Sequence, residues 1–117
     1  MGAPRRPLVR IALEIRFVAM NSSEAIEILR AHASELRHLG VARAALFGSV
    51  ARGDADADSD VDILLELDPA AELDVYDYVG VVQFITRLFP VPVDVANRES
   101  LKSHVRPEAE RDAIYAF

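Results

Sequence analysis

The fold of this chain is decided by residues 47–67, FGSVARGDADADSDVDILLEL, in which a glycine-serine turn and an acidic loop lead into an apolar run. Residues 59–67 alternate between polar and apolar and then become almost wholly apolar, which predicts a strand buried against a core. The short apolar stretch at 41–47 predicts a second strand, and SVAR at 49–52 predicts a short helix after the turn. The centre of the fold is therefore two strands joined by an acidic loop.

The flanking segments predict helices around these strands. Residues 21–40 begin with a capping residue, repeat apolar positions on one face and end at a glycine, which predicts one helix. Residues 74–89 have helical spacing up to Pro90, residues 91–96 (VPVDVA) predict a third strand, and the C-terminal residues predict a turn and then a helix with Pro107 near its start. The order α-β-β-α-β-α predicts an α/β (α+β) fold, a small mixed sheet flanked by helices.

Length and composition limit the classes of function. The chain has 117 residues, enough for one domain, and it has no cysteine. Metal binding is therefore left to carboxylates and histidines, which favours hard cations. The net charge is −6, and the basic residues concentrate in residues 1–19, so the rest is more acidic still. Such a surface disfavours nucleic acid and suits a cation or a basic partner protein.

Residues 1–19 resemble a signal peptide at first sight, with arginines followed by apolar residues. Arg10, Glu14 and Arg16 interrupt that pattern, and no run is long enough to span a membrane. We expect a cytoplasmic protein without membrane contact. Residues 1–19 are interpreted as an N-terminal extension from an upstream start codon, with an added strand that pairs with a partner as the alternative, and residues 20–117 as the domain.

Three aspartates are candidates for metal binding. Residues two apart on a strand point the same way, so Asp60 and Asp62 share a face, and at that spacing two carboxylates can bracket a pair of cations. Asp94 lies among valines in 91–96, where we expect it to be buried; an uncompensated charge there would be costly. A metal ion shared with Asp60 and Asp62 would compensate it.

The glycine-serine turn is a candidate phosphate site. A strand that ends in Gly48 and Ser49 and turns into a short helix would direct backbone N–H groups and a hydroxyl at one point, which favours a phosphate. Arg52 could add a charge-assisted contact to that phosphate, or it could form a structural salt bridge with a loop aspartate. Phosphate beside magnesium-binding carboxylates indicates a nucleoside triphosphate.

Two other motifs fail at named positions. The Gly48 to Gly53 spacing resembles a Walker A loop, but Asp54 and Ala55 follow where lysine and serine or threonine are required. DADADSD resembles the start of an EF-hand, but Ser59 stands where glycine is required and Leu65 where glutamate is required. Asp54, Asp56 and Asp58 are therefore interpreted as a solvated turn.

Gly48-Ser49, Arg52-Gly53 and Ser59-Asp60-Val61-Asp62 together resemble the GSxARG…SDxD signature of the nucleotidyltransferase superfamily that includes polymerase β. The small size resembles the minimal nucleotidyltransferase branch, and the resemblance extends from the helix at Asn21 to Asp94 and the C-terminal residues. It implies that Asp60, Asp62 and Asp94 bind two Mg²⁺ ions and that Gly48 and Ser49 hold the triphosphate of ATP.

The resemblance also implies a partner. Small members of this branch act as antitoxins of HEPN-domain ribonuclease toxins by adding AMP to a tyrosine of the toxin, so a hetero-oligomer is expected. Two alternatives remain: an antitoxin that neutralises the toxin by binding alone, and a nucleotidyltransferase for a small molecule such as an aminoglycoside. The absence of a domain for binding a small acceptor counts against the second.

Overall fold

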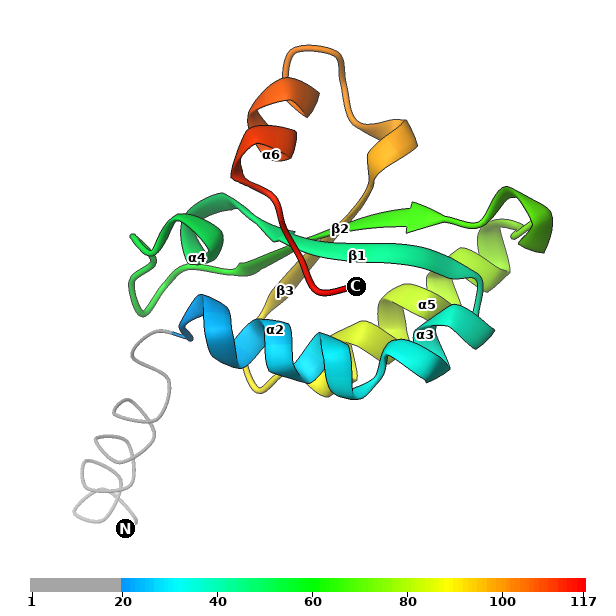
Figure 1. The fold of residues 1–117 in the computed structure, drawn as a ribbon, viewed down its shortest axis with the longest axis horizontal. Coiled ribbons are helices and arrows are strands. Elements are labelled where there is room, and N and C mark those ends of the chain that lie inside the picture. Colours follow the sequence, from blue (N-terminus) through cyan, green and yellow to red (C-terminus); the bar gives the residue numbers. More distant parts are fainter. Residues whose placement is uncertain (1–19) are drawn as a thin grey trace, which may run out of the picture.

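Strands β1 (Val41–Phe47) and β2 (Val61–Leu67) form the centre of a four-stranded sheet in the computed structural model, which describes residues 20–117. They pair antiparallel, with Phe47 opposite Asp62. Strand β3 (Val93–Asn97) runs parallel to β2, and β4 (Ile114–Tyr115) runs antiparallel to β1, in the order β3-β2-β1-β4. The predicted mixed sheet is confirmed (Figure 1). Residues 1–19 lie outside the described residues, so their interpretation as an N-terminal extension stays a prediction.

The helix expected over residues 21–40 is in fact two helices, α2 (Ser22–Ala31) and α3 (Ala33–His38). The predicted cap is present, because the Glu24 N–H donates to Asn21 Oδ1 at 2.8 Å and the Asn21 N–H donates to Glu24 Oε1 at 3.1 Å. The break comes at His32, whose backbone N–H donates to Leu29 while its ring Nδ1 donates to the carbonyl of Ile28 at 2.9 Å. The side chain thus takes the acceptor that the regular helix would have used.

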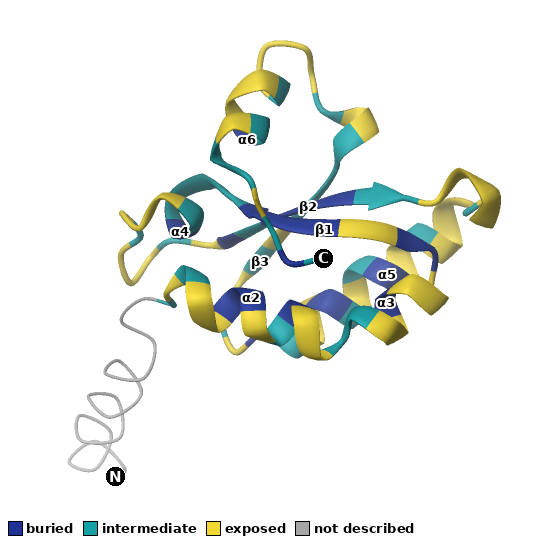
Figure 2. Cartoon of the chain, viewed as in Figure 1, coloured by how far each residue is buried: buried dark blue, intermediate teal, exposed yellow. Residues whose placement is uncertain are grey.

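One face of the sheet carries the main core. Helices α2, α3 and α5 (Val75–Leu88) lie along this face in Figure 1, and Figure 2 shows the buried positions that line them. On β2, Val61, Ile63 and Leu65 are buried here, as the alternation of the strand requires. From the helices they are joined by Leu29 and Ile85, among others.

The opposite face of the sheet carries the C-terminal part of the chain. The 3₁₀ turn η2 (Arg98–Ser100) and helix α6 (Arg106–Asp112) lie on this side in Figure 1. Ala109 of α6 is buried, as are Ala45 and Leu64, which pair with each other on β1 and β2. This face also carries Asp62, since it shares its side of β2 with Leu64.

The other boundaries are close to those predicted. Strand β2 begins at Val61, helix α5 is capped by Asp74, and α4 (Gly48–Arg52) is the short helix expected after the turn. A 3₁₀ turn η1 (Pro69–Ala71) and strand β4 have no counterpart in the prediction. Across the part of the chain that the structure describes, no helix is both long and apolar enough to cross a membrane.

Candidate active site

Asp62 and Asp94 are paired positions on the parallel strands β2 and β3. Paired residues of neighbouring strands point to the same side of a sheet, so the two carboxylates share one face. Asp60 directly precedes β2 and lies two residues from Asp62. The three candidate residues therefore gather at one end of the two strands, as the sequence predicted for Asp60 and Asp62.

The expected burial of Asp94 is wrong, because its side chain is exposed. Strand β3 is at the edge of the sheet, and its partly buried Val93 and Val95 are the residues that pack against the core. Asp94 alternates to the other face, where little covers it. Its charge needs no metal ion to offset burial.

Asp62 is the carboxylate whose ionisation is most affected by its surroundings. The pKa of Asp62 is raised from 3.8 to about 6, first by partial burial and then by the negative charges of Asp94 and Asp60. The positive charge of Arg52 opposes this rise. Within residues 20–117, the positive charge near Asp62 is thus too small to keep its carboxylate easily ionised.

Gly48 begins α4 directly beside Asp62. The residue before it, Phe47, pairs with Asp62, and the Gly48 backbone has φ +72°, a conformation that favours glycine. A Cβ added at Gly48 would overlap Asp62 Oδ2 and would lie 3.1 Å from Asp62 Cγ. Only a residue without a side chain lets the turn approach the carboxylate this closely, so the Gly48-Ser49 turn and the aspartates form one site.

Arg52 ends α4 and makes two ion pairs. Its Nε donates to Asp54 Oδ2 at 3.2 Å and its Nη1 donates to Asp112 Oδ2 at 2.9 Å. The sequence left two roles open for Arg52, and the structural salt bridge to a loop aspartate, here Asp54, is present. The second partner, Asp112 at the end of α6, was missed, because nothing in the sequence brings residues 60 positions apart together.

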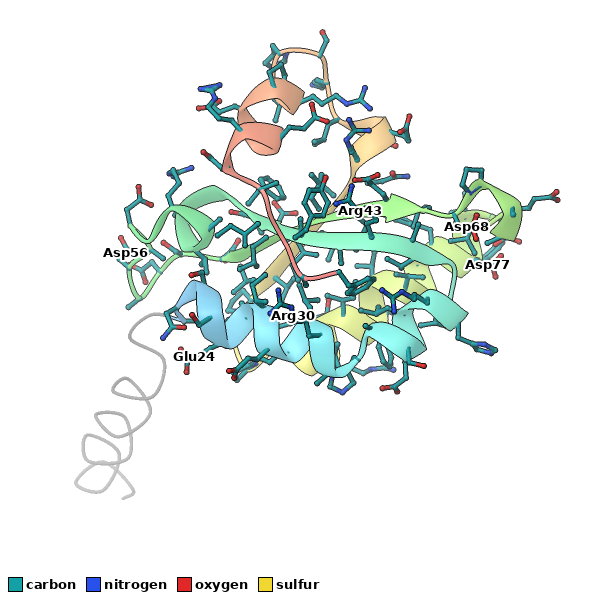
Figure 3. The ribbon with its side chains drawn as sticks, in the orientation of Figure 1. Glu24, Arg30, Arg43, Asp56, Asp68 and Asp77 are labelled. Carbon is teal, nitrogen blue, oxygen red and sulfur yellow. The ribbon has the colours of Figure 1, made fainter. Side chains whose placement is uncertain are left out.

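The acidic loop closes on itself. Asp56 Oδ1 accepts from the Asp58 N–H at 2.9 Å and from the Ser59 hydroxyl at 3.2 Å, while the Asp56 N–H donates to Ser59 Oγ at 3.0 Å. Asp54, Asp56 and Asp58 are all exposed, and Asp56 is seen at the outer end of its loop in Figure 3. These contacts support the interpretation of these three residues as a solvated turn.

The donor set suits a hard cation, although the side chains are not arranged around one. Asp60, Asp62 and Asp94 offer carboxylate oxygens, the ligands that Mg²⁺ prefers. The negative charges of Asp60 and Asp94, which add to the effect of burial in raising the pKa of Asp62, are what a bound cation would neutralise. Within residues 20–117, no three His, Cys, Asp or Glu side chains are grouped closely enough to hold an ion as they stand. Binding would require these side chains to turn toward one another.

The mixed sheet, the paired aspartates of β2 and β3 and the glycine-serine turn at the start of α4 agree with the nucleotidyltransferase motif in the sequence. Residues 26–116 match the nucleotidyltransferase domain family. The chain belongs to this nucleotidyltransferase family.

The individual proteins that this chain is similar to are small members of the nucleotidyltransferase family. The chain is 37% identical over 100 residues to the protein adenylyltransferase MntA of Thermococcus cleftensis, covering 84% of this chain and 99% of that protein. A solved structure described as a candidate minimal nucleotidyltransferase is 30% identical, with a TM-score of 0.61 and coverage of 81% of this chain and 95% of that one. The resemblance to minimal nucleotidyltransferases is confirmed.

A third comparison is a complex of a tri-AMPylated HEPN toxin with an MNT antitoxin from Shewanella oneidensis. The matched chain is 17% identical, with a TM-score of 0.55 and coverage of 79% of this chain and 71% of that one. At this identity the likeness concerns the fold. It places the same arrangement of sheet and helices in a protein that occurs together with a toxin.

Proposed function

We propose that this chain is a Mg²⁺-dependent nucleotidyltransferase that transfers AMP from ATP to a tyrosine hydroxyl of a partner protein. The partner is a HEPN ribonuclease toxin, and the chain acts as its antitoxin. The observation that carries the proposal is the closeness of the Gly48 turn to Asp62, with Asp94 on the neighbouring strand. The name of the Thermococcus relative and the AMPylated toxin in the Shewanella complex support the acceptor class. We place this activity in the cytoplasm, where ATP is found.

The residues have separate tasks in this proposal. Gly48 and Ser49 hold the triphosphate by backbone N–H groups and the serine hydroxyl. Asp60, Asp62 and Asp94 hold the cations, which when bound would neutralise the charge on the phosphate oxygens. Arg52 is a further candidate for contact with the nucleotide, although its guanidinium is held by Asp54 and Asp112 in this structure.

The reaction is an in-line displacement at the α-phosphorus of ATP. The acceptor oxygen forms a bond to the α-phosphorus, the bond from this phosphorus to the bridging oxygen breaks, and pyrophosphate leaves. The hydroxyl proton passes to the Asp94 carboxylate, which is exposed and open to an incoming acceptor. An exposed base suits an acceptor that arrives on another protein.

Intact-protein mass spectrometry of the toxin tests the proposal. The HEPN-domain toxin is incubated with ATP, Mg²⁺ and either this chain or its variant Asp60→Asn/Asp62→Asn. The matched control is Asp56→Asn/Asp58→Asn, which removes the same charge from the exposed loop. We expect additions of AMP with the wild type and the loop variant, and none with the site variant.

Two results would contradict the proposal. Addition of AMP by Asp60→Asn/Asp62→Asn would show that these carboxylates are not needed. No addition by the wild type, with a stable complex between the two proteins, would support an antitoxin that acts by binding alone.

A further inference from the structure

The second partner of Arg52 lies on the C-terminal helix, and we propose that Asp112 is a positioning residue that braces α4 through Arg52 and thereby sets the affinity for the nucleotide. This inference rests on the proposed function for the identity of the ligand, ATP. It assigns to the C-terminal segment a role in the site formed by the strands and α4.

Helix α4 needs a support from outside itself. It has five residues and no side-chain hydrogen bond at its N-cap, so it lacks the length and the capping that stabilise a helix alone. Its orientation nevertheless determines where the Gly48-Ser49 turn directs its backbone N–H groups. A contact at the other end of the helix, at Arg52, therefore controls the turn.

The pairing of β4 with β1 explains why Asp112 provides this contact. Ile114 pairs with Leu46 and Tyr115 with Ala45 in an antiparallel ladder. Asp112 precedes Ile114 by two residues and Gly48 follows Leu46 by two residues, and both line a groove of about 250 Å³ with Arg52. Helix α4 follows directly after β1, and α6 leads into β4, which pairs with β1. Asp112 and α4 therefore lie at the same end of β1.

The C-terminal segment is itself held at several points. Arg98 of η2 donates to Glu110 of α6, and the Tyr115 hydroxyl donates to Glu66 Oε2 at 2.8 Å. Further along, Arg30 of α2 donates to the carbonyl of Ala116 at 2.8 Å, and in Figure 3 Arg30 lies by the C-terminal strand. Asp112 is therefore a fixed point against which α4 can rest.

Of the two carboxylates that pair with Arg52, Asp112 is the better brace. Its side chain is 18% exposed and its distance to Arg52 Nη1 is 2.9 Å. The side chain of Asp54 is 61% exposed, at 3.2 Å, and lies only two residues from Arg52 in a loop. Water and salt weaken exposed pairs more than shielded ones, and a pair within one loop cannot fix α4 to another element.

Binding of ATP in the presence of Mg²⁺, measured by isothermal titration calorimetry, tests the proposal without any need for transfer. We expect Asp112→Asn to weaken ATP binding about tenfold, because it removes the negative charge that strengthens the hydrogen bond from Arg52. The matched control Asp54→Asn removes the charge of the other partner and is expected to change the affinity less than about twofold.

A double-mutant cycle separates bracing from general destabilisation. If Asp112 acts through Arg52, Asp112→Asn has no further effect on ATP affinity once Arg52 is replaced by Gln. In transfer assays the loss should appear in KM for ATP, with kcat little changed. A kcat loss alone, equal effects of Asp112→Asn in both backgrounds, or wild-type affinity in Asp112→Asn would overturn the proposal.

These experiments distinguish a failure of the bracing role of Asp112 from a failure of the proposed function. If the wild type binds ATP and Asp112→Asn binds it more weakly, the bracing role stands even when no AMP reaches the toxin. If the wild type transfers AMP and Asp112→Asn has an unchanged KM for ATP, the proposed function stands and the bracing role falls. A wild type that binds no ATP contradicts both.

Discussion

Asp62 and Asp94 stand side by side on the two parallel strands of the sheet, and Gly48 approaches the first of them so closely that no Cβ would fit. This relationship brings residues 48, 62 and 94 together at one end of strands β2 and β3. It is the basis for the predictions that follow.

Asp94→Asn should reduce AMP transfer by about 10²-fold or more, since it removes the candidate proton acceptor. The substitution is at an exposed position, so the fold should not change. Transfer rates and thermal melting are to be measured on the same preparation. A variant that melts like the wild type and still transfers AMP at the wild-type rate would exclude Asp94 from the reaction.

Gly48→Ala should destabilise the protein and abolish transfer, because the new methyl group would overlap the Asp62 carboxylate. Gly53→Ala is the matched control. Gly53 also has a positive φ, +81°, but a Cβ there would meet no atom of the described residues 20–117 within 4 Å. The control should lose about 1–2 kcal/mol of unfolding free energy from backbone strain alone.

Chemical denaturation and a transfer assay of both glycine variants check this difference. Equal losses of stability and activity in the two variants would mean that backbone strain, and not contact with Asp62, explains the glycine at position 48.

The contribution of Asp62 to the stability of the metal-free protein should fall as the pH rises from about 4 to above 6. The pKa of Asp62 is raised from 3.8 to about 6 in the folded chain, mainly by burial, so the folded state holds this proton more tightly than the unfolded state. The stabilisation is complete below the ordinary pKa and is lost as the pH passes through the raised one.

Asp62→Asn should therefore raise the melting temperature above pH 6 by a few degrees while it abolishes transfer. The side chain is only partly buried, so solvent limits the gain. Melting temperatures from pH 4 to pH 8 in EDTA, for the wild type and this variant, provide the measurement. A variant with the same pH slope as the wild type would show that another group titrates.

Tyr115→Phe should lower the unfolding free energy by about 1 kcal/mol, because it removes a partly buried hydrogen bond to Glu66 and keeps the ring beneath Arg43. Tyr76→Phe is the matched control, as Tyr76 is 87% exposed and should show no change. Urea denaturation of both variants measures the difference. Equal stability of the two variants would mean that the Glu66 contact does not stabilise the C-terminal strand.

The helices and strands were largely predictable from local patterns. Alternation defined β2, the Asn21 capping box defined the start of α2, and Pro90 marked the end of α5 closely. The break at His32 was not predictable, because His32 is compatible with a helix and the hydrogen bond from its ring depends on how it packs. Strand β4 was missed, since two residues carry no periodic signal and exist as a strand only through pairing with β1.

In the candidate site, too, some features were predictable from local sequence and others were not. By itself the sequence determined the spacing of Gly48, Ser49, Asp60 and Asp62, because these residues are local and their chemistry follows from residue type and strand alternation. Only the tertiary structure decided that Asp94 lies exposed beside Asp62 and that Asp112 pairs with Arg52. Both depend on which strands are neighbours and in which register they pair, and that is set by packing of the whole sheet, over sequence separations that local patterns do not encode.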